Sequence, residues 1–85
     1  MSRFYSIGPE MLKISEFNIP SGFSRVNIPL KSGEMKLKKG VIIGAVERDV
    51  AIIIPRGNDV IHCGDRIIVL SESQLELLSP NDLFL

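Results

Sequence analysis

Two apolar runs rich in β-branched residues lie close together in the middle of the chain, and they limit its fold more than any other feature. Residues 41–46 form the first run and residues 51–54 the second, with the polar link 47–50 between them. Branching at Cβ favours the pleated backbone of a strand, and so short a link joins antiparallel neighbours as a hairpin. Because both runs are almost continuously apolar, they predict hairpin strands that are buried on both faces.

Two further strands are predicted, one on each side of this hairpin in the sequence. In residues 11–17, the apolar Leu12 and Ile14 alternate with polar neighbours, which is the pattern of a strand with one buried face. Residues 66–70 form the last predicted strand, because they are again rich in Ile and Val and follow the turn 63–65.

A short helix is predicted after the last strand. Ser71 and Gln74 have the spacing of a capping box. In such a box the Ser71 side chain accepts a hydrogen bond from the Gln74 backbone N–H, and the Gln74 side chain reaches back to the backbone of Ser71. The helix is expected to run through residues 75–78 and to end before Pro80, because proline disfavours helical geometry in its predecessor. Residues 83–85 are more apolar than a free tail, so they either seal the core or meet a partner.

The stretch 25–39 between the first strand and the hairpin follows no single period. Pro29 cannot donate to a sheet ladder, so this stretch is an edge strand or a short irregular connector. Met35 and Leu37 are expected in the core, while the lysines around them stay in solvent.

The length and composition fit one small domain. The chain has 85 residues, 45% of them apolar, with twelve Ile, six Val and no Trp. We predict an α+β fold: a small, mostly antiparallel sheet curled into a pseudo-barrel, in the order strand, connector, two strands, loop, strand and helix. The short C-terminal helix caps this sheet. Residues 1–10 are interpreted as a lead-in or linker remnant and residues 11–85 as the domain.

The charge pattern bears on the partners of this domain. Ten basic and ten acidic residues give a formal net charge of zero, without the basic surplus that a phosphate backbone requires. No nucleic acid is therefore expected, although a small barrel-like transcription regulator stays as the alternative, because such proteins also carry Gly-Asp-Arg before an apolar strand. Residues 1–43 carry seven basic and three acidic groups, net +4, and residues 44–85 carry three and seven, net −4. Two explanations stay open. The folded domain has surfaces of mixed charge, or copies of the chain pair so that the two signs meet.

Catalysis is not expected. His62 is the only histidine and Cys63 the only cysteine, and adjacent side chains on an extended chain point to opposite faces. No metal-ligand cluster and no glycine-rich phosphate loop occurs, so we expect no metal and no cofactor. One cysteine excludes an internal disulfide, and no apolar run reaches the ~18 residues of a membrane span. These features predict a soluble, cytoplasmic protein.

Several polar residues are placed on turns around the hairpin. Arg48, Arg56, Asn58 and His62 can converge there on an anion or a nucleotide. Alternatively, Asn58 and Asp65 bond to nearby backbone amides and the arginines are solvated. The sequence does not decide between these two interpretations.

The order of these segments resembles a known family. An apolar strand followed by Arg48, a second strand that leads to Pro55, and Gly64-Asp65 before the last strand are similar to the RCK-C (TrkA-C) regulatory domain of Trk/Ktr-type potassium-uptake proteins. The upstream turn at residues 20–22 also resembles the family, and the similarity covers about residues 11–78. The connector departs from it, because many members have a short helix there.

The resemblance implies a regulatory domain that forms a homodimer on the cytoplasmic side of a membrane-embedded potassium channel or transporter. Some members bind cyclic di-AMP between two copies of the domain. Carried over by position, the residues that face this ligand are Arg48, Ile53, Ile54 and Pro55. Complete regulatory subunits usually carry a Rossmann domain before this one, so the chain is expected to be an excised domain or a stand-alone module.

Overall fold

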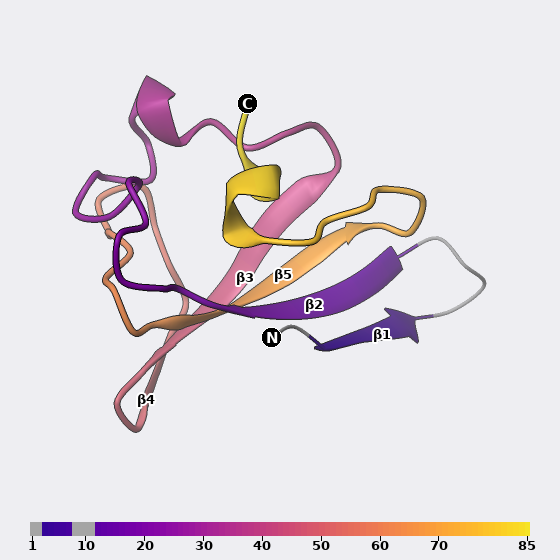
Figure 1. Cartoon of the computed structure of the whole chain (residues 1–85), viewed down its shortest axis with the longest axis horizontal. Helices are drawn as coiled ribbons and strands as arrows, with labels where there is room; N and C mark the ends of the chain where they lie inside the picture. Colours follow the sequence, from indigo (N-terminus) through magenta and orange to yellow (C-terminus); the bar gives the residue numbers. More distant parts are fainter. Residues whose placement is uncertain (1–2, 8–11) are drawn as a thin grey trace.

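Five strands form one open, twisted antiparallel sheet in the described part of this computed structural model, which comprises residues 3–7 and 12–85 (Figure 1). The strands follow the order β1-β2-β5-β3-β4, so the last strand in the sequence lies in the middle of the sheet. The two edges, β1 and β4, do not pair with each other, and the predicted pseudo-barrel is therefore not closed. The strands are β1 Arg3–Ile7, β2 Leu12–Asn18, β3 Val41–Arg48, β4 Ala51–Ile53 and β5 Arg66–Glu72.

The central strand, which the sequence predicts, has burial that alternates along it. In β5, Ile67, Val69 and Ser71 are buried, and the residues between them are only partly covered. Ser15 and Phe17 of β2 lie opposite Val69 and Ile67 in the sheet register, so they face the same covered side. The prediction that Leu12 and Ile14 mark the buried face of this strand is wrong, because Leu12 is 41% exposed and the core lies on the side of Phe17. One face of the sheet therefore carries the core, as an antiparallel sheet allows.

Residues 3–7 lie in the stretch 1–10 that is interpreted as a lead-in or linker remnant, and they form a strand. They form β1, which pairs along β2 from Arg3 opposite Glu16 to Ile7 opposite Leu12. A strand at an edge needs only an extended backbone and one neighbour, so this pairing forms without a clear apolar period in the sequence. The other residues of that stretch lie outside the described part of the chain.

The hairpin is confirmed, but its predicted burial on both faces is wrong. β3 and β4 pair antiparallel across a two-residue turn, in which Asp49 has a φ of 57°. In β3 only one face is covered, because Ile42 is 63% exposed. β4 is an edge strand beyond the reach of β5, and Ile52 is 58% and Ile54 70% exposed.

The predicted C-terminal helix is also wrong. Ser71 continues β5 and pairs with Lys13 and Val41 on its two sides, so it does not cap a helix. The helical segments in the described residues are two short 3-10 turns, Gly33–Met35 and Pro80–Leu83. Pro80 is the first residue of the second turn. The backbone N–H at this position makes no hydrogen bond within a helical turn, so proline, which has none, is tolerated there.

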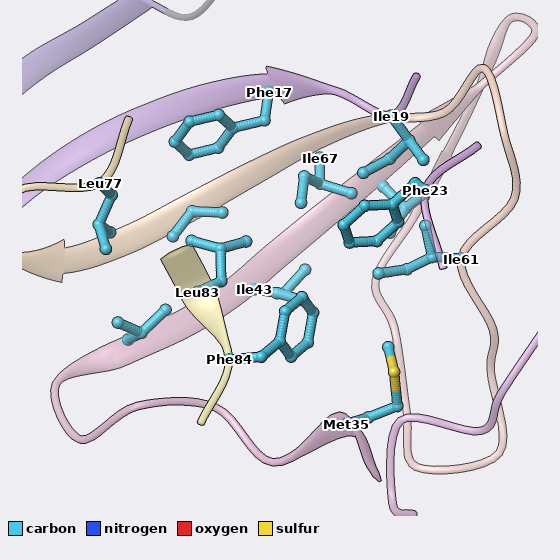
Figure 2. Packing of buried hydrophobic residues seen from close by; sticks show 13 residues of the cluster. Phe17, Ile19, Phe23, Met35, Ile43, Ile61, Ile67, Leu77, Leu83 and Phe84 are labelled. Carbon is cyan, nitrogen blue, oxygen red and sulfur yellow. The ribbon is translucent and has the colours of Figure 1, made fainter. Parts of the chain in front are cut away.

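The core lies on the covered face of the sheet, and residues of the irregular connector 19–40 and of the C-terminal segment 77–85 complete it (Figures 1 and 2). Met35 is 2% exposed, as predicted, and Leu37 packs against the core. Leu83 and Phe84 are buried, which decides in favour of the sealing role for these two residues, whereas Leu85 is 70% exposed.

Candidate functional site

The C-terminal end of β3 is fixed to the loop before β5 by one ion pair. Arg48 donates from Nε to Oδ1 and from Nη2 to Oδ2 of Asp65, both at 2.8 Å. Nη2 also donates to the Val60 carbonyl at 3.0 Å. The side chain of Asp65 is 2% exposed and that of Arg48 29% exposed, so the pair lies at the border between core and solvent.

The electrostatics of this pair follow from its surroundings. Burial alone would raise the pKa of Asp65, but hydrogen bonds from the Arg48 guanidinium and from the His62 backbone N–H hold it below its usual value. The hydrogen bond to Asp65 likewise raises the pKa of Arg48. Asp65 is therefore a fixed anion, and Arg48 is held in one orientation by a planar two-point contact.

The loop around Asp65 is shaped by backbone hydrogen bonds. Ile19 N–H donates to the Asp65 carbonyl at 2.8 Å, and Gly64 N–H donates to the Ile19 carbonyl at 2.9 Å. Gly64 has a φ of +89°, a left-handed conformation that glycine adopts at little cost. This turn aims the Asp65 carboxylate back at the end of β3, where Arg48 meets it.

A cleft of about 220 Å³ opens beside this ion pair. Arg48, Ile53 and Pro55, three of the four residues carried over from the family, line it. The fourth, Ile54, is 70% exposed and does not line it. The other lining residues are Val46, Asn58, Asp59, Val60 and His62.

The structure also answers how the polar residues of the turns are arranged. Asn58 and His62 join Arg48 at the cleft, whereas Arg56 lines a different cavity. The alternative interpretation is partly right, because Asp65 does accept from a nearby amide, yet Arg48 is paired and not solvated. The turn bond expected of Asn58 is made by Asp59, whose Oδ2 accepts from the Arg56 N–H at 2.7 Å.

The cleft combines an apolar wall with polar groups suited to hydrogen bonding. A guanidinium has five N–H donors, and the described contacts of Arg48 use Nε and Nη2 but not Nη1. Nη1 therefore has donors left for a ligand, and Asn58 and His62 add donors and acceptors nearby. Because Asp65 already neutralises Arg48, the cleft is suited to a ligand that binds by hydrogen bonds and apolar contact together.

The described residues offer no sign of a metal centre. No group of three or more His, Cys, Asp or Glu side chains in residues 12–85 is placed to hold a metal ion. Cys63 is a free, exposed thiol. No helix in the part of the chain that the structure describes is long and apolar enough to cross a membrane.

A protein-family model matches most of the chain. The family model described as the TrkA-C domain matches residues 14–79, which include most of β2, the whole of β3, β4 and β5, and all the residues that line the cleft. No curated protein matches the chain.

Proposed function

The chain belongs to the TrkA-C domain family, whose members are regulatory domains associated with potassium transport, and we propose that it regulates a Trk/Ktr-type potassium-uptake system from the cytosol. It does so as a homodimer that binds a cyclic dinucleotide, cyclic di-AMP, at the cleft beside Arg48. The domain makes contact with the membrane only through its channel or transporter partner. The observation that carries this proposal is the cleft itself, which gathers Arg48, Ile53 and Pro55.

The chemistry of the cleft fits a nucleotide. Ile53 and Pro55 give an apolar surface for the flat face of a base, and the free donors of Arg48 Nη1 suit a phosphate oxygen. Asn58 and His62 lie where they can bond to base or sugar atoms. The ion pair with Asp65 holds Arg48 in place before the ligand arrives, which lowers the entropy lost on binding.

Pairing between copies is supported by the edge of the sheet next to the cleft. β4 is an edge strand, so one side of its backbone pairs with no strand in the described residues. Its surroundings are apolar: Val50 is 100%, Ile52 58% and Ile54 70% exposed. An uncovered apolar edge is a template for another strand, and a second copy placed there brings two clefts close together.

Binding without chemistry is part of the same proposal. The ion pair beside the cleft, Arg48 with Asp65, is already satisfied, so the Asp65 carboxylate is not free to act as a base or a nucleophile. The role of the domain is then to convert ligand occupancy into a change in how two copies pair.

Isothermal calorimetry with cyclic di-AMP tests the site. Arg48→Ala is a poor variant for this purpose, because it also leaves Asp65 without its main partner. The double variant Asn58→Ala, His62→Ala removes only cleft side chains, and Asn81→Ala, an exposed asparagine outside the cleft, is its matched control.

The expected result is saturable binding by the wild type and by Asn81→Ala. The double variant should bind about tenfold more weakly, since two modest hydrogen bonds together contribute about that factor. Absence of heat with the wild type, or equal affinities for the double variant and its control, would show that this cleft is not the site.

A further inference from the structure

A second cavity, separate from the cleft, lies between the connector and the loop after β4. It encloses about 250 Å³, and its wall is made by Leu30, Met35, Leu37, Ile42 and Ile43. Met35 and Ile43 are buried and form its floor, whereas Ile42 is exposed at its mouth. Such an apolar hollow, partly open, has the character of a small-molecule site.

The polar groups at this cavity are cationic. Lys31 and Arg56 line it and are exposed, and no lining residue is acidic. Neither side chain forms a hydrogen bond or ion pair with the residues that the structure describes. An apolar hollow with two unpaired cations is complementary to a ligand with a hydrocarbon body and a negatively charged group at one end.

We infer that this cavity binds an aliphatic carboxylate of medium chain length. The hydrocarbon body lies against Met35 and Ile43, and the carboxylate is held between Lys31 and Arg56. A hollow of about 250 Å³ has room for an alkyl chain of several carbons. Methionine favours such a ligand, because its flexible thioether adapts to an alkyl chain.

The cavity is held open by bonds that do not involve a ligand. Lys31 N–H donates to the Gly57 carbonyl and Leu30 N–H to the Asp59 carbonyl, both at 2.9 Å. These bonds need a close approach of two backbones, since a Cβ on residue 57 would lie 3.2 Å from Lys31 Cβ. Within the same loop, the Arg56 N–H donates to Asp59 Oδ2 and so fixes the backbone at Arg56. Both cations therefore stand on fixed backbone.

The floor is fixed in a similar way. Ser32 caps the 3-10 turn Gly33–Met35 by accepting from the Glu34 N–H at 3.2 Å, and Met35 N–H donates to the Ser32 carbonyl at 2.9 Å. Pro55 is the one lining residue that the cavity shares with the cleft beside Arg48. The inference thus goes beyond the proposed function and does not depend on it.

Amide NMR of the ¹⁵N-labelled chain, titrated with sodium octanoate, tests the inference. The expected result is a saturable shift of signals from residues around the cavity, such as Lys31, Met35, Ile43 and Gly57. Octanamide has the same body without the charge, and octylammonium has the opposite charge. Both should bind at least about tenfold more weakly, the factor that one lost charge-assisted contact produces.

The double variant Lys31→Gln, Arg56→Gln should bind octanoate more weakly by a similar factor. The control is the double variant Lys36→Gln, Lys38→Gln, because these exposed lysines do not line the cavity. Octanoate that fails to saturate at about 10 mM would overturn the inference. So would equal affinity for octanoate and octanamide, or shifts confined to the cleft residues Asn58 and His62. The comparison of ligands uses the wild type alone, so it does not depend on how the variants fold.

Discussion

At the scale of single residues, the account depends on the pair formed by Arg48 and Asp65. Replacing Arg48 by alanine leaves an almost fully buried carboxylate with a backbone donor as its described partner. We expect Arg48→Ala to lower the free energy of unfolding by about 2–4 kcal/mol, somewhat less than for a completely buried pair because Arg48 is partly exposed. Urea unfolding measures this loss. Arg56→Ala, an exposed arginine without such a partner, should change the free energy by less than about 0.5 kcal/mol.

The same pair predicts how stability depends on pH. The pKa of Asp65 is lower in the folded state than its ordinary value of about 3.9. Its ionisation therefore contributes fully to stability above that ordinary value, and the contribution disappears as the pH falls from there through the folded-state pKa. Urea unfolding at pH 7, 5 and 3 should show a steeper loss for the wild type than for Asp65→Asn. Parallel losses in the two proteins would exclude Asp65 as the group responsible.

The sequence allowed part of this site to be predicted. Arg48, Ile53 and Pro55 follow from the family resemblance, and Asn58 and His62 from their positions on turns around the hairpin. The partner of Arg48 did not follow, because Asp65 is 17 residues away and meets it only after the chain has passed through the loop. Ile54 follows Ile53 directly, and adjacent side chains on an extended chain point to opposite faces. Strand geometry alone therefore argues against both lining the same cleft, and Ile54 is 70% exposed and does not line it.

At the scale of elements, the C-terminal segment is the clearest test of the core. Leu83 is completely buried, while Leu78 is 74% exposed in the same segment. Leu83→Ala should cost about 2–5 kcal/mol through lost burial and the cavity left behind, and Leu78→Ala should be nearly neutral. Thermal and urea unfolding measure both. A small effect at Leu83 would mean that the segment does not seal the core in solution.

Two errors at this scale have physical causes. Ser71 and Gln74 have the spacing of a helix cap, but the alternation of β5 continues through Ser71, and sheet pairing on both sides outweighs a local signal. Residues 51–54 have the apolar run of a buried strand, yet only Ile53 packs against the core in the described chain, whereas Ile52 and Ile54 are exposed. A continuous apolar run shows only that both faces of the strand are apolar. A strand in the core and an edge strand that binds a partner therefore have the same composition.

At the scale of the whole molecule, the exposed apolar residues of the hairpin are the feature that a dimer would explain. If a second copy covers β4, then Ile52→Lys should weaken the dimer, because a charge would have to be buried or displaced there. Leu78→Lys places the same charge on another exposed aliphatic residue, outside the hairpin, and should leave the dimer intact. Sedimentation velocity over a range of concentrations compares the two variants with the wild type.

The most direct test of the central claim is the mass of the complex formed with cyclic di-AMP, measured by native mass spectrometry or sedimentation equilibrium. The account predicts two chains around one ligand, with a population of dimer that rises as ligand is added. A single chain that binds its own ligand, or a chain that stays monomeric at saturating ligand, would contradict it.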